Sequence, residues 1–171
     1  METTEKIVEC YCRYIQKWFT ITNVGCGNQQ EIDILAINPI TGEKCHIECG
    51  VSISGSFSKL TAKPFDPELL KDRVKAPAQR RTIGYFIQKK FGSPEIIKKL
   101  EEFGFCEGQY TRIIVTWGWT LMAKKIADQK GVILWDMRTI FEELVKLCQE
   151  TKSYSKNDTM RTLQLFVRRK K

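Results

Sequence analysis

The chain has 171 residues, of which 42% are hydrophobic and 28% charged, with a formal net charge of +8. This length and composition are ordinary for one soluble globular domain. No apolar run approaches the roughly 20 residues of a membrane span, and no signal-peptide pattern opens the chain, so no membrane partner is expected. Seven cysteines without regular spacing are typical of a reducing compartment, which predicts a cytoplasmic protein with free thiols.

The positive charge is concentrated in two blocks. Residues 54–102 carry 11 basic and 6 acidic side chains, and residues 150–171 carry 7 basic and 2 acidic ones, whereas residues 1–53 are net acidic. Basic surface is the usual electrostatic footprint of proteins that contact nucleic acid, although many basic proteins bind none. If nucleic acid binds, its affinity should fall steeply as salt rises, and deleting Arg168 to Lys171 should weaken it uniformly across sequences.

The first half of the chain predicts one helix followed by three strands. Apolar residues recur at helical spacing over residues 4–18, which indicates an amphipathic helix. The side chains expected to pack this helix on a sheet are Ile7, Tyr11, Ile15 and Trp18. The strands are predicted over residues 19–24, 31–38 and 44–53, with the last two joined by a hairpin-type connection.

The second half predicts an insertion and then a strand–helix–strand unit. The insertion, at about 55–109, has helical segments over residues 67–75, 80–91 and 94–103. The unit that follows has a strand over 111–119, a helix over 120–130, a strand over 131–136 and a helix over 137–149. This order suggests a parallel crossover that completes a single domain over residues 1–149. The basic tail, 150–171, is predicted to be a short edge element or a mobile arm.

Two carboxylates, Asp33 and Glu48, fall inside predicted strands, where burying a charge is costly without a cation. Because side chains alternate along a strand, Glu48 shares a face with His46 and Gly50, opposite Cys45. If the polar faces of the two strands coincide, Asp33 and Glu48 converge, and their oxygens favour Mg²⁺ or Mn²⁺. The alternative is that both are solvated side chains on the open face of an antiparallel sheet.

Four segments of the sequence, taken in their order along the chain, resemble the pattern of a known family. The pieces are "EKIVECYCRYIQKWFTITNV", "EIDILA", "HIECG" and "RIIVTWGWTLMAKKIADQKGVILWDMRTIFEEL", which cover the first 53 residues and roughly 110–147. Together they resemble the PD-(D/E)xK nuclease superfamily. The resemblance implies an α/β fold with a mixed central β-sheet flanked by helices and a restriction-endonuclease-like core (αβββαβ). It also implies a metal-dependent nuclease that hydrolyses phosphodiester bonds, with DNA favoured over RNA, and a homodimer is one arrangement by which such enzymes cut two strands.

The resemblance also implies roles for individual residues. Asp33 and Glu48 match the Asp and the (D/E) of the family pattern, and the backbone carbonyl of Cys49 matches a frequent additional metal ligand. Glu5 matches the glutamate of the opening helix, and Glu9, one turn on, is the second choice. The ion they hold, Mg²⁺ or Mn²⁺, would position a water for attack on a phosphodiester.

The chain departs from the family at Gly50, where the pattern has a lysine that contacts the scissile phosphate. One explanation is that Lys59 or Lys63, just after the third strand, folds back to supply the missing cation. The other is a degenerate site, in a nucleic-acid-binding or interaction module on the same fold that does not cut. In that case Gly50→Lys would refill the family position.

Other functional classes fit the sequence less well. A zinc site at Cys45, His46 and Cys49 is disfavoured because His46 points away from both cysteines in a regular strand. No glycine-rich phosphate loop and no nucleophile elbow is visible. Most aromatic residues are expected in the core, and the exceptions are Trp117 and Trp119, at a strand end.

Overall fold

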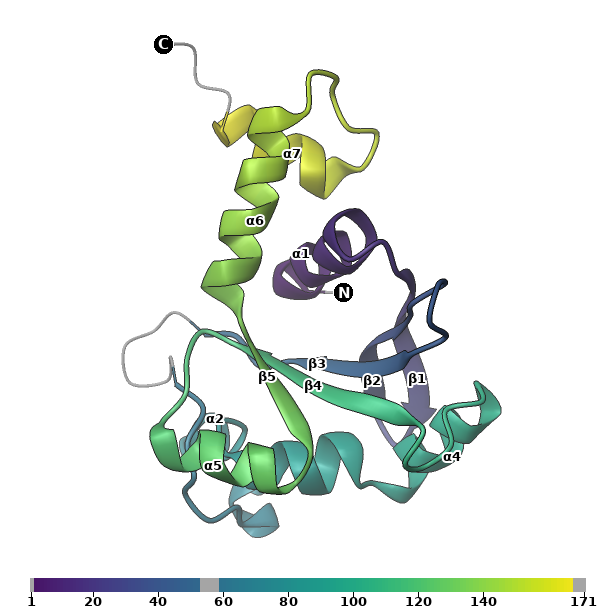
Figure 1. Cartoon of the computed structure of the whole chain (residues 1–171). Coiled ribbons are helices and arrows are strands. Elements are labelled where there is room, and N and C mark those ends of the chain that lie inside the picture. The colour runs from purple at the N-terminus through teal and green to yellow at the C-terminus, as the bar shows by residue number, and fades with distance from the viewer. Residues whose placement is uncertain (1, 53–58, 168–171) are drawn as a thin grey trace.

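The computed structural model describes residues 2–52 and 59–167, and within them five strands form one mixed sheet (Figure 1). The strands are β1 (Phe19–Gly27), β2 (Gln30–Ile37), β3 (Lys44–Cys49), β4 (Tyr110–Thr116) and β5 (Val132–Asp136). Their order in the sheet follows the chain, with antiparallel β1–β2 and β2–β3 pairs and parallel β3–β4 and β4–β5 pairs. The α/β class with a mixed central sheet is therefore confirmed.

Helices cover both faces of this sheet, with α1, α6 and α7 on one side and α2, α4 and α5 on the other (Figure 1). The α-helices are α1 (Thr3–Cys10), α2 (Ala76–Gln79), α3 (Ile83–Tyr85), α4 (Pro94–Glu102), α5 (Leu121–Gln129), α6 (Met137–Glu150) and α7 (Asp158–Val167). The described residues also include two π-helical segments, η1 (Tyr11–Ile15) and η4 (Phe86–Phe91), and one 3₁₀ segment, η3 (Pro67–Lys71). Among the described residues, no helix is long and apolar enough to cross a membrane.

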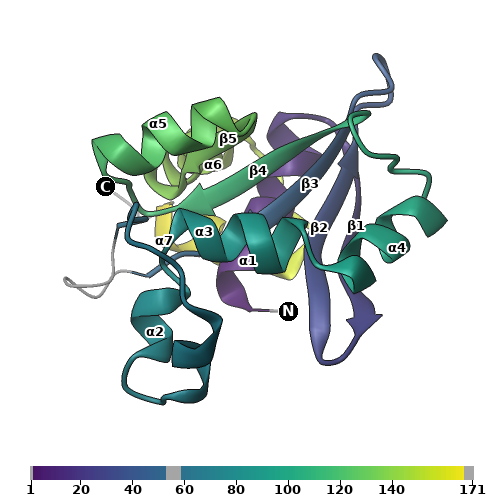
Figure 2. The same cartoon turned by 90° about the horizontal axis from the view of Figure 1, so that it is seen from below.

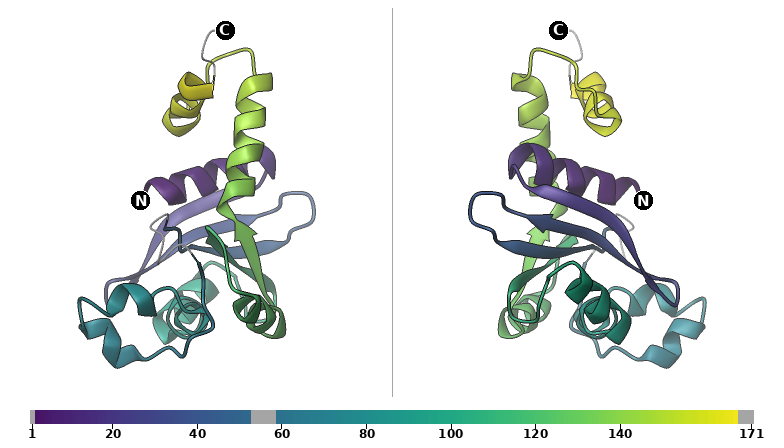
Figure 3. Two further views of the ribbon diagram at one scale, coloured as in Figure 1. Left: turned by 90° about the vertical axis from the view of Figure 1, so that its left-hand side faces the viewer. Right: turned by 90° about the vertical axis from the view of Figure 1, so that its right-hand side faces the viewer.

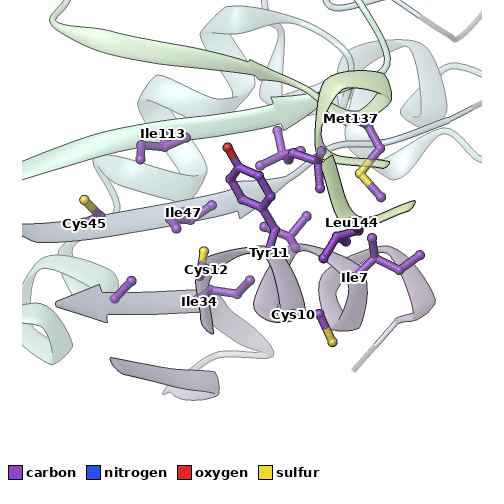
Figure 4. Close-up of a cluster of buried hydrophobic side chains, with 14 of the residues drawn as sticks. Ile7, Cys10, Tyr11, Cys12, Ile34, Cys45, Ile47, Ile113, Met137 and Leu144 are labelled. Carbon is purple, nitrogen blue, oxygen red and sulfur yellow. The ribbon is translucent and has the colours of Figure 1, made fainter. Parts of the chain in front are cut away.

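The first face of the sheet is apolar and packs against α1 and α6 (Figure 4). Cys45 and Ile47 point into this cluster, as alternation along β3 predicts. The residues predicted to pack the opening helix all join it, with Ile7 and Tyr11 buried and Ile15 and Trp18 half-buried. The helix ends earlier than predicted, because α1 passes into η1, which stops at Ile15.

The chain after α6 forms a packed helix. In α7, Met160, Leu163 and Val167 recur at helical spacing and contact the cluster that α1 and α6 share. The prediction of an edge element or mobile arm is therefore wrong for Asp158–Val167, where an apolar stripe finds a surface to cover. Arg168 to Lys171, whose deletion the sequence suggested, lie outside the described residues.

The predicted insertion is the connection between the parallel strands β3 and β4, and it covers the second face of the sheet. Its helix α4 packs against β1 and β2, and η4 packs beside α4. The segment with η3 and α2 projects to one side of the sheet as a small lobe (Figures 2 and 3). The face that carries Asp33 and Glu48 is consequently roofed, and the alternative of an open, solvated face is wrong.

Candidate functional site

Asp33 and Glu48 converge on the roofed face of the sheet, at neighbouring positions of β2 and β3. The register pairs Ile34 with Ile47 and Leu35 with His46, which places the two carboxylates side by side. Both are buried, and the Cys49 amide donates a hydrogen bond of 2.7 Å to Asp33 Oδ2. Alternation along the strands therefore predicted this pair correctly.

A lysine from the insertion meets both carboxylates. Lys90, in η4, has its Nζ 3.1 Å from Asp33 Oδ1 and 2.5 Å from Glu48 Oε2. This ammonium supplies the cation that two buried carboxylates need. Lys90 lies 42 positions after Glu48 in the sequence and was not among the predicted site residues.

The two lysines that sequence analysis selected lie elsewhere. The chain at Leu60 pairs with Trp119, so Lys59 lies beside the extension of β4 and lines a different hollow. Lys63 is exposed. Neither lines the cleft at Asp33, and Lys90 corrects the expectation that one of them stands at the carboxylate pair.

The glycine at position 50 is explained by a ring from the same helical segment as Lys90. A Cβ atom at Gly50 would lie 2.4 Å from Cζ of Phe86, whose side chain is buried in the core of the second face. A lysine at position 50 would therefore collide with Phe86, and Lys90, four residues after Phe86, reaches the carboxylates from the roof. The Gly50 carbonyl accepts a hydrogen bond from Arg81.

His46 holds the other side of Glu48. Its Nε2 lies 2.7 Å from Glu48 Oε1, and Phe91 packs edge-on against the imidazole with ring centroids 4.8 Å apart. Burial and the charge of Lys90 lower the pKa of His46 to about 3, so the ring is neutral at pH 7. His46 and Cys45 point to opposite faces, as the argument against a zinc site requires.

Asp33, Glu48 and Lys90 are in contact, so their protonation equilibria are coupled. Burial and the neighbouring Glu48 raise the pKa of Asp33 to about 7, and burial raises the pKa of Glu48 to about 7 as well. Burial opposes the charge of Lys90, but the two carboxylates outweigh it and raise the pKa of the ammonium above its ordinary value. Lys90 therefore stays charged at neutral pH, next to carboxyl groups that exchange protons there.

Asp33 lines a cleft of about 240 Å³ at the carboxyl end of β3, whereas Glu48 is fully buried and is not part of the lining. The charged lining of the cleft comprises Glu2, Glu5, Glu31, Asp33, Arg80, Arg81 and Lys90. The acidic residues come from the opening helix, its N-cap and β2, and the basic ones from the insertion. Acidic and basic walls therefore face one cleft, an arrangement that suits a cation together with an anion.

Of the two glutamates proposed on the opening helix, Glu5 lies at this cleft. It is buried, and its Oε2 accepts hydrogen bonds from the Glu2 amide (2.9 Å) and from Asn23 Nδ2 (3.3 Å). One carboxylate oxygen each from Glu5, Glu31 and Asp33 lie within 4.8 Å of one another. Glu31 was not selected from the sequence, although it shares the strand face of Asp33.

Glu9 and Glu48 are engaged differently. Glu9 accepts from Arg13 (3.3 Å) and Thr20 (3.4 Å) and does not line the cleft. Glu48, with no exposed side-chain surface, is occupied by His46 and Lys90. Glu5, Glu31 and Asp33 thus bring carboxylate oxygens together at the cleft, and Asp33 is the residue that they share with the predicted set of Asp33, Glu48 and the Cys49 carbonyl.

Comparison with known proteins gives little further information. No family model matches the sequence, and no curated protein does. A crystal structure of a protein of unknown function, AF1548, matches with a TM-score of 0.46 and 19% sequence identity over 82% of this chain. The match spans 65% of the length of that protein.

Proposed function

We propose that this protein is a metal-dependent hydrolase of phosphodiester bonds in nucleic acid, with DNA as the favoured substrate. Its core is of the restriction-endonuclease type, and Lys90 takes the place of the family lysine. The observation that carries the proposal is the position of the Lys90 ammonium, in contact with both Asp33 and Glu48. This chain has glycine at position 50, where the family has a lysine. Lys90 of the insertion supplies a cation to the same pair of carboxylates, Asp33 and Glu48.

Four charged residues of the cleft, together with the buried Glu48, have a catalytic or positioning role in this proposal. Glu5, Glu31 and Asp33 would hold Mg²⁺ or Mn²⁺, which lowers the pKa of a water and stabilises charge on the phosphate. Lys90 would contact an oxygen of the phosphate and stabilise the negative charge that develops there. Glu48, held by His46, orients Lys90.

A basic surface beside the cleft supports a polyanionic substrate. Arg80 lines both the cleft and an adjoining hollow of about 300 Å³, and Lys89 lines the hollow. The opposite wall of that hollow includes Gln29 and Gln30, at the turn between β1 and β2. A nucleic-acid backbone crossing the cleft would therefore pass between this turn and the insertion.

Cleavage assays test the proposal directly. Plasmid, single-stranded DNA and structured RNA are incubated with Mg²⁺ and with Mn²⁺, and we expect cleavage that Asp33→Asn abolishes. The amide keeps the size of the carboxyl group but cannot carry its charge. Robust cleavage by Asp33→Asn would overturn the mechanism.

Metal binding should depend on pH. Because the pKa of Asp33 is raised to about 7, most Asp33 is protonated at pH 6, and a cation must displace that proton. We expect Mn²⁺ affinity, measured by calorimetry, to rise between pH 6 and pH 8 with release of protons. Asp33→Asn should abolish binding, and Glu9→Gln is the matched control outside the cleft. Equal affinity at both pH values would contradict a role for Asp33 as ligand.

The salt dependence of nucleic-acid binding should come from basic residues of the insertion. Arg80→Ala is expected to weaken binding of a DNA duplex and to reduce the slope of log K against log salt by about one. Fluorescence anisotropy in EDTA at several salt concentrations measures this slope without cleavage. Lys6→Ala removes an exposed cation on α1 and is the control. An unchanged slope for Arg80→Ala would place the phosphates elsewhere.

One observation favours a second candidate, a module that binds nucleic acid without cutting. Glu48 is fully buried, and Lys90 occupies the space between it and Asp33. A lysine ammonium in that place can take the position of a metal ion as well as act beside a bound metal ion. In this case, salt-dependent binding should persist while no substrate is cut with either metal.

A further inference from the structure

A second hollow, of about 480 Å³, opens where β4 and β5 end. It is lined by Lys59, Trp117, Gly118, Trp119, Asp136 and Arg138. Nothing in the proposed hydrolytic site uses these residues. Two indole rings and two cationic side chains around one open hollow form the combination that stacks nucleobases and holds the backbone beside them.

The hollow adjoins the cleft along the carboxyl edge of the parallel strands. The Gly50 amide, at the cleft, donates a hydrogen bond of 2.8 Å to the Val115 carbonyl. Trp117 follows two residues later, about 7 Å of extended chain. Val51, which lines the cleft, and Trp117 pack against the same apolar cluster. A nucleic acid with one phosphate at the cleft can therefore place a neighbouring nucleotide at the indoles.

The two tryptophans are fixed in place before any ligand arrives. The Leu60 amide donates to the Gly118 carbonyl (2.8 Å), and the Thr120 amide donates to the Leu60 carbonyl (3.0 Å). Both indoles are half-buried, Trp117 against the core of the first sheet face and Trp119 against that of the second. Stacking on such rings requires little further ordering, which favours affinity.

The cations of the hollow are also positioned. Asp136 accepts from Arg138 Nε at 3.0 Å and from Nη2 at 2.5 Å, which holds the guanidinium at the rim. Lys59 borders the floor, since its Cγ lies 3.8 Å from the place a Cβ would take at Gly118. Gly118, which has no side chain, lines the hollow together with Lys59 and the two tryptophans.

We propose that this hollow binds an unpaired nucleobase of the nucleic acid whose phosphate lies at the cleft. A base inside a duplex has both faces covered, so stacking on an indole requires a base that is already unpaired or is turned out. The substrate would then carry a single-stranded segment beside the bond that is cut. This inference rests on the proposed function for the location of the phosphate only.

Filling the hollow tests the inference. Gly118→Leu should be tolerated, because a Cβ there meets, among the described residues beyond its two chain neighbours, only the Lys59 side chain at 3.8 Å, and the backbone is not left-handed. The probe is an eight-residue oligothymidylate in EDTA, with tryptophan fluorescence as the readout. We expect quenching of the wild-type protein, and an affinity lowered roughly 5- to 100-fold in Gly118→Leu. Leu121→Ala, exposed at the start of α5, is the control.

The outcomes separate this inference from the hydrolase proposal. Equal oligothymidylate affinity for wild type and Gly118→Leu, with both proteins folded, would overturn the stacking site. Cleavage in Mn²⁺ with no preference for gapped over fully paired DNA would overturn it as well and leave the hydrolase standing. Quenching that Gly118→Leu weakens, without cleavage of any substrate, would support the hollow and remove the hydrolase.

Discussion

Replacing Lys90 with methionine is expected to abolish cleavage and to lower the free energy of unfolding by about 3–5 kcal/mol near pH 8. The variant leaves Asp33 and Glu48 buried without a cation, and Glu48 has no exposed surface through which water could solvate it. Methionine keeps the length of the side chain, so loss of charge rather than of volume is measured. Among the described residues that line the cleft, Lys90 is the one that forms ion pairs with two buried carboxylates.

The loss should depend on pH in a defined direction. The pKa values of both carboxyl groups are already raised to about 7, and without Lys90 they should rise further. A carboxyl group with a raised pKa stabilises the fold below its unfolded value, near 4, and loses that contribution as pH rises through the folded value. The deficit of Lys90→Met should therefore be largest above pH 7 and vanish near pH 4.

Denaturant unfolding at pH 8, 6 and 4.5 measures this effect. Lys89→Met, one residue away and not in contact with the carboxylates, is the matched control. A deficit of the same size at all three pH values would indicate lost packing instead of a lost ion pair. No deficit at pH 8 would contradict the ion pair.

Substituting Gly50 is expected to destabilise the protein and not to improve the site. Even Gly50→Ala places a Cβ 2.4 Å from the Phe86 ring, and the ring is packed among the buried residues of the second face. Overpacking of this kind costs about 1–3 kcal/mol. Gly50→Lys should be at least as damaging and should not raise activity, which reverses the expectation that it refills the family position.

A compensating change makes this prediction specific. In the double variant Gly50→Ala with Phe86→Leu, the smaller side chain removes the ring atom that the new Cβ would meet. We expect the two changes together to cost less than the sum of their separate costs, as contacting residues do in a double-mutant cycle. Thermal unfolding of the four proteins gives the coupling. Additive losses would show that Phe86 does not restrict position 50.

The acidic pair could be predicted from the sequence because strand alternation acts over a few residues. Asp33 and Glu48 lie near a hairpin connection that fixes the register, so their convergence follows from local geometry. The covering of their face could not be predicted in this way, because it depends on how the insertion returns over the sheet. Lys90 could not be predicted for the same reason, because it contacts the two carboxylates only through tertiary packing.

One sequence signal for Lys90 exists in the helical pattern. Ile83, Phe86 and Ile87 form an apolar stripe that ends on Lys90 and Phe91 at helical spacing. A lysine on an apolar stripe predicts a buried anionic partner, since an isolated buried ammonium is costly. Lys59 and Lys63 lack such a context and were selected because they follow β3 closely.

The π-helical turn of η4 makes the site sensitive to chain length. Its hydrogen bonds span five residues, so Phe86, Lys90 and Phe91 return to one side and meet Gly50, the carboxylates and His46. Deleting a single residue, such as Gln88, without a change in helical geometry would move the following residues by one position and rotate their side chains by about 100° around the helix axis. Lys90 and Phe91 could not then both keep their contacts. A one-codon insertion or deletion, more than most substitutions, is therefore the genetic step that would assemble or dismantle this site.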